Sequence, residues 1–126
     1  MESDGYKAMK KLLAQSPRID AVFAANDPAA IGAMKAIWEA GLRVPEDIAI
    51  VGVGNIALSD LLRVPLTTVS WSREEQGRQA AELILDRIGP HPSSMKMRRI
   101  IIPPQLVVRR SSGRQGTDDG LTNGKW

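Results

Sequence analysis

Short apolar runs alternate with amphipathic stretches along most of this chain. The runs Asp20–Ala25, Ile48–Val53 and Leu66–Ser70 have the length and β-branched content of strands, and Leu106–Val108 is a shorter apolar run. Ile48–Val53 is almost continuously apolar, which predicts a strand covered on both faces. A helical stretch separates the first two runs, so the pattern predicts parallel strands joined by a right-handed crossover. The fold class expected is α/β, with a parallel sheet flanked by helices.

The helix between the first two strands has the clearest end signals. Asp27 is a suitable N-cap, Pro28 suits the first helical position, and Gly41 suits a left-handed stop. Its apolar positions recur at steps of three and four and predict one buried face: Ile31, Met34, Ile37 and Trp38.

Two further helices and one helical turn are expected. Helical spacing predicts the first helix from its apolar positions Tyr6, Met9, Leu12 and Leu13. Ser72 and Glu75 form a capping box that opens a helix over residues 73–88. A short helical turn fits within Asn55–Val64.

Polar residues follow each of the three longer strands directly. They are Asn26–Asp27, Gly54–Asn55 and Trp71. If the strands are parallel neighbours, these residues emerge at one edge of the sheet, where open α/β sheets bind ligands. The pattern therefore predicts a binding cleft rather than a set of catalytic residues.

Composition narrows the function classes. The chain has 126 residues, no cysteine, a net charge of +3 and dispersed basic residues, which favour solvated faces over a nucleic-acid surface. Its one histidine, His91, lies between two prolines, so no thiolate chemistry, histidine-centred triad or multi-histidine zinc site is available. No transmembrane stretch or signal peptide is seen. We expect a cytoplasmic protein that is not an enzyme and has no cofactor, metal or membrane partner.

A dinucleotide site is an alternative. Gly52–Ala57 fits the relaxed fingerprint G-x-G-x-x-A after a strand, with Glu74 about twenty residues on. The fingerprint requires a long helix next, and Pro65 leaves little room for one. It also normally follows the first strand of a fold, so we do not favour an oxidoreductase.

Four stretches, in order and with matching spacing, resemble the C-terminal part of the sensor of the lactose/galactose-repressor (LacI/GalR) family. They are Ala21–Met34, Ala40–Gly52, Pro65–Val69 and Leu106–Gly113. The resemblance implies a partial periplasmic-binding-protein-like type I lobe, which is Rossmann-like. It also implies effector binding and dimerisation within a bacterial transcription regulator.

The resemblance sets the expected domain organisation. Residues 1–112 correspond to a partial sensor, in which the helix over residues 73–88 belongs to the other lobe and would have little to pack on. From Ser111 the composition turns polar, and residues 113–126 are expected to be a disordered tail. The family's helix-turn-helix segment, most of its N-terminal lobe and the first strands of its C-terminal lobe have no counterpart, so we expect a truncated fragment that reaches DNA only through that missing segment.

The resemblance also assigns candidate ligand-binding residues. Asn26 would hydrogen-bond a ligand hydroxyl, whereas Asp27 is adequately explained as a helix cap. Gly54–Asn55 stands where relatives often carry an aspartate pair after an aromatic residue. The absence of that carboxylate disfavours a simple sugar and leaves Asn55 and the backbone at Gly54 as polar contacts. Turns explain the glycines equally well. Trp71 would either stack on a ligand ring or pack against the hinge.

The partners expected are a small-molecule effector, sugar or nucleoside-like, and a second copy of the chain. The segments that form the subunit interface in the family carry five apolar candidates here: Ile31, Met34, Leu58, Leu61 and Leu62. Ordinary core packing is the alternative for these residues. A stand-alone solute-binding protein is the alternative function, although it would need an export signal.

Overall fold

A computed structural model describes residues 1–15, 19–88 and 97–113. Its helices are α1 (Glu2–Gln15), α2 (Asp27–Glu39), α3 (Leu58–Leu61) and α4 (Arg73–Ile88), followed by a 3₁₀ turn over Arg110–Ser112. Its strands are β1 (Ala21–Phe23), β2 (Ala49–Val53), β3 (Thr67–Ser70) and β4 (Gln105–Val107). The expected elements are therefore present. β1, β2 and β3 are one to three residues shorter than their apolar runs, and β4 begins and ends one residue earlier than its run.

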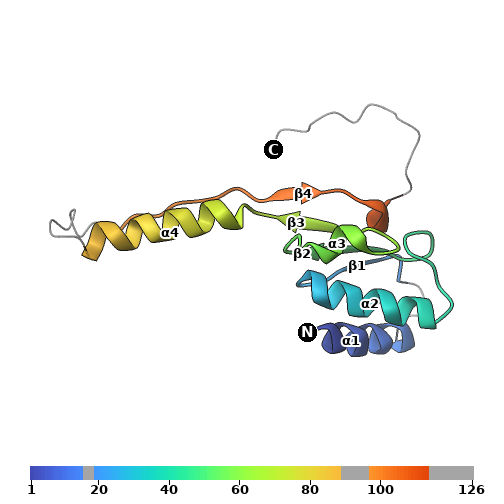
Figure 1. Cartoon of the computed structure of the whole chain (residues 1–126). Coiled ribbons are helices and arrows are strands. Elements are labelled where there is room, and N and C mark those ends of the chain that lie inside the picture. The colour runs from blue at the N-terminus through green and yellow to red at the C-terminus, as the bar shows by residue number, and fades with distance from the viewer. Residues whose placement is uncertain (16–18, 89–96, 114–126) are drawn as a thin grey trace, which may run out of the picture.

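The four strands form one sheet in the order β1-β2-β3-β4 (Figure 1). β1, β2 and β3 are parallel, as the sequence predicts, but β4 runs antiparallel to β3. The sheet is therefore mixed rather than parallel, because the chain returns along β3 after α4 instead of crossing over the sheet.

The helices α1 and α2 lie on the same face of the sheet (Figure 1). The opposite face has no helix from the described residues, and Phe23 and Leu106 there are 68% and 60% exposed. Val51 and Val53 are only half-buried, so the expectation that β2 is covered on both faces is wrong for this chain. The continuous apolar run at Ile48–Val53 thus belongs to a strand that α2 covers on one face only.

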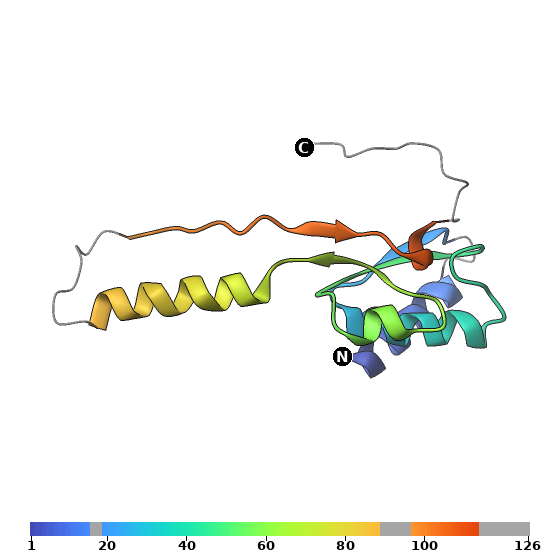
Figure 2. The ribbon, with the colours of Figure 1, turned by 45° about the horizontal axis from the view of Figure 1, so that its top comes forward.

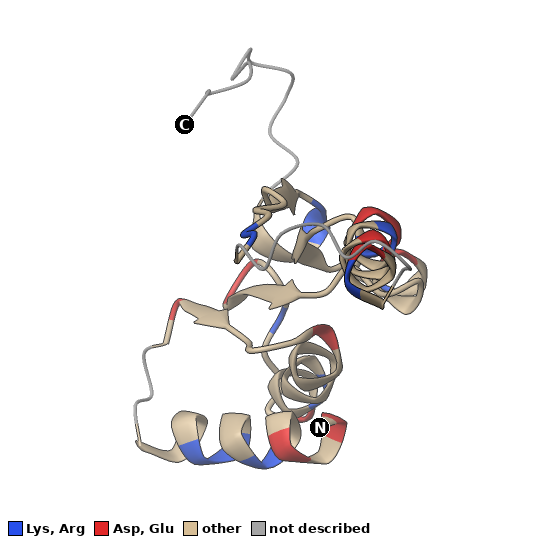
Figure 3. Ribbon diagram, turned by 90° about the vertical axis from the view of Figure 1, so that its left-hand side faces the viewer, with Lys and Arg blue, Asp and Glu red and all other residues tan. Residues whose placement is uncertain are grey.

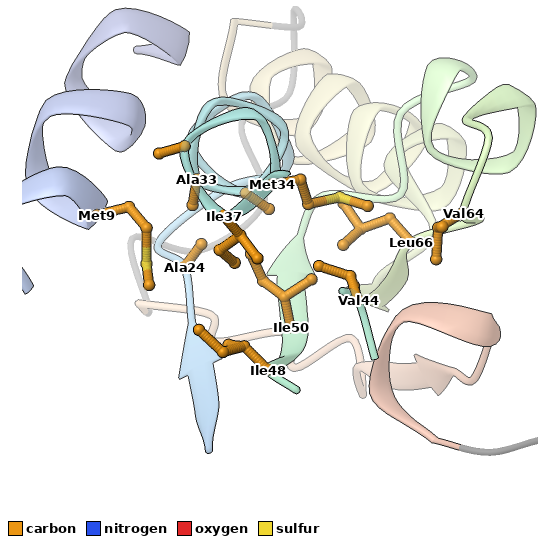
Figure 4. Packing of buried hydrophobic residues seen from close by; sticks show 12 residues of the cluster. Met9, Ala24, Ala33, Met34, Ile37, Val44, Ile48, Ile50, Val64 and Leu66 are labelled. Carbon is orange, nitrogen blue, oxygen red and sulfur yellow. The ribbon is translucent and has the colours of Figure 1, made fainter. Parts of the chain in front are cut away.

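The core is a single layer between α2 and the sheet (Figure 4). Met34 and Ile37 of α2 are completely buried against Ile50 and Leu66, and Met9 joins them from α1. Burying side chains of this size is worth about 1.5–3 kcal/mol each relative to exposure, so this layer stabilises the packing of α2 on the sheet. Trp38, expected in the buried face, is 40% exposed.

Two glycines allow α1 and α2 to approach backbone to backbone. A Cβ atom on Gly5 would lie 2.0 Å from the carbonyl oxygen of Ala29, and one on Gly32 would lie 1.9 Å from that of Glu2. No side chain fits at such distances. The two helices can therefore pack this closely only with glycine at both positions.

The ends of α2 differ from expectation at one residue. Asn26, not Asp27, is the N-cap, because its Oδ1 accepts a hydrogen bond from the Ala29 amide at 2.9 Å. Gly41 has the left-handed φ of 75° that was expected of the stop. Asp27 is thereby left for a different role, described below.

The helix α4 and residues 97–104, which lie beside it, extend away from the rest of the molecule (Figures 1 and 2). No residue of α4 is buried, and Ile84, Leu85 and Ile88 are more than half exposed. Beside the helix, the Arg98 guanidinium donates a hydrogen bond to the Asp86 carboxylate at 2.8 Å. The expectation that this helix has little to pack on is confirmed.

The start of α4 contains half of the expected capping box. Ser72 Oγ accepts the Glu75 amide at 3.2 Å, as the motif predicts. The Glu75 carboxylate instead accepts hydrogen bonds from Arg78 and from Gln79, which lower its pKa to about 2.

Charged residues are scattered over the surface, as Figure 3 shows. Lys7, Lys10 and Lys11 are exposed on α1, consistent with a solvated face. No helix of the described residues is long and apolar enough to cross a membrane. His91 and residues 114–126 of the expected tail lie outside the described residues.

The polar segment after Arg110 begins inside the fold. Ser111 is completely buried: its hydroxyl donates to the Ile50 carbonyl at 2.7 Å and accepts the Thr67 amide at 2.8 Å. The change in composition at Ser111 therefore marks a polar bridge between β2 and β3 and not the start of a tail.

Candidate functional site

The polar residues that follow β1, β2 and β3 do emerge at one edge of the sheet, as expected. Backbone hydrogen bonds hold the strand ends in register: the Ala24 amide donates to Val51 O and the Gly54 amide donates to Val69 O, each at 2.8 Å. The three loops are thereby fixed side by side at the carboxyl edge of the sheet.

The loop after β2 turns sharply at Gly54 and Asn55. Both residues have positive φ, 125° at Gly54 and 46° at Asn55, a conformation that glycine adopts freely and asparagine tolerates. Gly52 has a different reason: a Cβ there would lie 2.4 Å from Asp27 Oδ1. The structural explanation of both glycines is therefore sufficient.

The Asn55 side chain is bonded at both ends. Its Nδ2 donates to Ser70 Oγ at 3.3 Å, and its Oδ1 accepts from Arg109 at 2.9 Å. The backbone amide of Asn55 also donates to Thr68 Oγ1 at 3.2 Å. Asn55 therefore fixes the loop to β3.

Asp27 lies beneath this loop and is completely buried. Its carboxylate accepts hydrogen bonds from the Thr68 hydroxyl at 2.6 Å, the Ser59 hydroxyl at 2.7 Å and the Ile56 amide at 2.9 Å. Asp27 thus supports the loop from below. Its predicted roles as helix cap and ligand contact are both replaced by this one, because no surface of the residue remains exposed.

Arg109 is the site residue that sequence reasoning missed, having counted it among solvated basic residues. Its side chain is only 16% exposed and ion-pairs with Asp60 at 3.1 Å. The guanidinium also donates to Leu66 O at 2.8 Å and to Asn55 Oδ1. Its neighbours along the chain are charged or apolar, so no local pattern distinguishes it from the exposed arginines.

Arg73 links the first turn of α4 to the loop after β2. One terminal nitrogen donates to the carbonyl oxygens of Gly54 and Asn55, at 2.7 and 2.9 Å. The chain between β3 and α4, Trp71–Ser72, is only two residues long. Arg73 therefore bridges the point where α4 leaves the sheet domain, and it too was missed.

Trp71 is half-buried and faces α4 rather than Asn55. Its indole nitrogen donates to Gln76 Oε1 at 3.1 Å. The ring lines a groove of about 620 Å³ between α4 and residues 97–102, together with Leu83, Met97 and Ile100. This geometry fits the hinge-packing alternative, and ring stacking on a ligand stays a prediction.

Asn26 remains an exposed candidate at the end of β1. Its Oδ1 is used by the α2 cap, which leaves the Nδ2 amino group for an outside acceptor. Of the five predicted ligand contacts, the structure thus ties Gly54 and Asn55 into one loop, places Asp27 below it, and leaves Asn26 and Trp71 at its sides.

The predicted interface residues divide into two groups. Leu58 and Leu61 on α3 are 50% and 78% exposed, and Ile31 and Leu62 are half-buried. Met34, in contrast, is completely buried in the core, so its side chain cannot contact a second copy. Its place in the apolar stripe of α2 is explained by packing alone.

The dinucleotide alternative does not fit the geometry. The helix after Gly52–Ala57 is α3, which has four residues, and the Ile56 amide is already bonded to Asp27. In the dinucleotide fold the pyrophosphate sits on the N-terminus of a full helix. Among the described residues, no cluster of three or more histidine or acidic side chains could hold a metal ion.

Comparison with known proteins agrees with this architecture. Residues 1–112 match the family described as the periplasmic binding protein-like domain. This chain belongs to that family. The HTH-type transcriptional repressor PurR of Pasteurella multocida is 45% identical over 108 residues, 86% of this chain and 32% of the repressor. The repressor MelR of Bacillus subtilis is 42% identical over 110 residues, 87% of this chain and 31% of that protein.

Solved structures place the chain among LacI-type sensors. A transcriptional regulator CelR–cellobiose complex superposes with a TM-score of 0.84 at 35% identity, covering 89% of this chain and 34% of that one. A LacI-family regulator from Arthrobacter sp. FB24 in complex with lactose gives 0.79 at 33% identity, over 90% and 42%. The chain spans about a third of the curated relatives it matches. It corresponds to part of the sensor region of LacI-family transcriptional regulators.

Proposed function

We propose that this chain is the effector-binding and dimerisation portion of a bacterial LacI-family transcription regulator that acts in the cytoplasm. The observation that carries the proposal is the carboxyl edge of the sheet. There, the loop at Gly54–Asn55 is fixed by Asp27, Arg109 and Arg73, and it lies beside the exposed Asn26. Open α/β sheets bind their ligands at this edge, and two similar structures were solved with cellobiose and lactose.

The mechanism we propose is a population shift. An effector that binds between two lobes favours the closed or re-angled arrangement by its difference in affinity for the two states. Arg73 would transmit this change, because it joins the edge loop to the first turn of α4, beyond the hinge at Trp71–Ser72. DNA-binding segments joined to such a dimer would then change their spacing.

The binding part of the proposal is tested by nuclear magnetic resonance on the isotopically labelled chain. Amide shifts are followed during titration with neutral sugars, sugar phosphates and nucleosides. Shifts grouped at Asn26, Gly54–Asn55 and Ser70–Arg73 are expected for at least one of these ligands. Shifts confined to residues away from this edge would contradict the proposal. The nucleotide sequence upstream of the Met1 codon tests the regulator assignment, since an in-frame helix-turn-helix is expected there.

The dimer would form through α3 and the adjoining surface of α2. Leu58 and Leu61 expose large apolar side chains there, and Ile31 and Leu62 continue the same predicted surface. Removing such area from water stabilises an interface by about 25 cal/mol per Å². A two-fold dimer uses the same patch on both copies, so each substitution is counted twice.

The dimer is tested by sedimentation of Leu61→Ser. We expect its dimer dissociation constant to be at least about ten times that of the unaltered chain, since 1.4 kcal/mol is tenfold. Leu85→Ser is the matched control, because Leu85 is 63% exposed on α4. If both substitutions weaken the dimer equally, the two copies associate through a surface other than α3.

A further inference from the structure

The hydrogen-bonding groups at the carboxyl edge are not balanced between donors and acceptors. The acceptors are occupied within the protein: the Asp27 carboxylate receives three donors, Asn55 Oδ1 receives Arg109, and Asn26 Oδ1 receives the Ala29 amide. The carbonyl oxygens of Gly54 and Asn55 receive Arg73. Each of these acceptors therefore already receives at least one donor from the protein, and the Asp27 carboxylate is also buried.

Several donors at the same edge have no acceptor among the described residues. Arg73 uses one terminal nitrogen, which leaves Nε and the other terminal nitrogen. Ser70 Oγ accepts from Asn55, so its own hydrogen remains, and Asn26 keeps its Nδ2 amino group. Arg73 and Ser70 both contact Asn55, so their spare donors lie around the same residue.

The carboxylates of neighbouring residues do not accept hydrogen bonds from these spare donors. Glu75 is bonded to Arg78 and Gln79, and Asp60 is paired with Arg109. Glu74 follows Arg73 on α4, and successive residues of a helix project about 100° apart, which directs it away from the loop that Arg73 contacts. The net charge presented beside Asn55 is therefore that of the Arg73 guanidinium.

From this imbalance we infer that the effector carries an anionic acceptor group, a phosphate or a carboxylate, which binds Arg73 and Ser70 beside Asn55. The inference rests on the proposed function, since it names the ligand class of that same edge. The spare nitrogens of Arg73 offer such a group charge-assisted hydrogen bonds, which are shorter and stronger than those between neutral partners. A neutral polyol brings no charge to match the guanidinium, and Gly54 supplies no carboxylate to accept its hydroxyl protons.

The experiment titrates the labelled 126-residue chain with four probes at constant ionic strength: glucose, glucose 6-phosphate, gluconate and inorganic phosphate. Resonances of Arg73 Nε, the Ser70 amide and Asn26 Nδ2 are followed. We expect glucose 6-phosphate or gluconate to shift them and glucose to leave them in place. The stronger of the two charged sugars identifies the group as phosphate or carboxylate. Inorganic phosphate shows how much of the affinity the anion alone supplies.

Arg73→Gln should weaken binding of the charged probe at least tenfold. Arg73→Lys should recover only part of the loss, because lysine keeps the charge but lacks the planar guanidinium that holds the carbonyl oxygens of Gly54 and Asn55 while donating to the probe. Arg87→Gln, at the far end of α4, is the control and should bind as the unaltered chain does. Ser70→Ala gives a second measurement that does not depend on how Arg73 variants fold. If glucose alone shifts these residues, the inference fails while the proposed function stands. If no probe shifts them, or if Arg73→Gln binds unchanged, the inference fails as well.

Discussion

At the scale of single residues, the buried carboxylate of Asp27 organises the candidate site. It joins three segments through one side chain, since its partners belong to the edge loop, to α3 and to β3. A buried charge is tolerated only where donors surround it, and here three do. The residue beside Asn26 in the sequence therefore supports the site without touching its surface.

Replacing Asp27 tests that role. Asp27→Ala leaves two hydroxyl groups and the Ile56 amide without their acceptor, and we expect the free energy of unfolding in urea to fall by about 3 kcal/mol or more. Asp20→Ala removes an exposed carboxylate and should change it by less than about 0.5 kcal/mol. Similar losses in the two variants would show that the hydrogen bonds of Asp27 contribute little.

Asp47 provides a prediction of pH dependence. Arg43 donates its amide and two guanidinium nitrogens to this carboxylate, at 2.8, 2.8 and 2.9 Å, and lowers its pKa from the usual 3.8 to about 2. Because the pKa is lower in the folded state, this contact stabilises the fold above about pH 4 and its contribution is lost as pH falls towards 2. A carboxyl-carbon titration should show a midpoint near 2, and Arg43→Gln should raise it. A midpoint of 3.8 in the unaltered chain would contradict the contact.

At the scale of elements, the sequence predicted where helices and strands lie better than what surrounds them. Hydrophobic spacing and end signals located α1, α2 and α4 and the parallel order of β1, β2 and β3, because these depend on local chemistry. The sequence did not reveal the antiparallel β4, the open face of β2 or the role of Arg109. Those depend on contacts between residues far apart in the chain, such as the pairing of Val69 with Leu106.

The contact between α1 and α2 makes the next prediction. Alanine is favoured over glycine inside a helix by about 1 kcal/mol. Gly5→Ala and Gly32→Ala should nevertheless each lower the free energy of unfolding by about 1–3 kcal/mol, because the new Cβ meets a carbonyl oxygen of the other helix. Gly77→Ala is the matched control, since a Cβ there meets nothing within 4 Å. Its unfolding free energy should rise by about 0.5–1 kcal/mol. Thermal denaturation followed by circular dichroism compares the three, and stabilisation by Gly5→Ala would show that the helices are not in close contact.

At the scale of the whole molecule, the described residues leave large apolar surfaces uncovered. One face of the sheet and the whole of α4 expose large apolar side chains, and the carboxyl edge faces no second lobe. This exposure agrees with the expectation, drawn from the sequence resemblance, that α4 has little to pack on. The apolar surface of α4 and residues 97–102 is what such a lobe would cover.

The open carboxyl edge of the sheet predicts weak effector binding by this chain alone. Ligand pockets usually bury about 70–90% of a small ligand, and a single sheet edge leaves one side of it in water. A charge-assisted contact to Arg73 with a few neighbouring hydrogen bonds then supports a dissociation constant on the order of 1 mM, equivalent to about 4 kcal/mol. Titration calorimetry at micromolar ligand should therefore detect no binding, while resonance shifts at millimolar ligand should saturate and should be lost in Arg73→Gln. A micromolar dissociation constant would mean that this one edge already forms a full binding site, and the need for a second lobe would have to be abandoned.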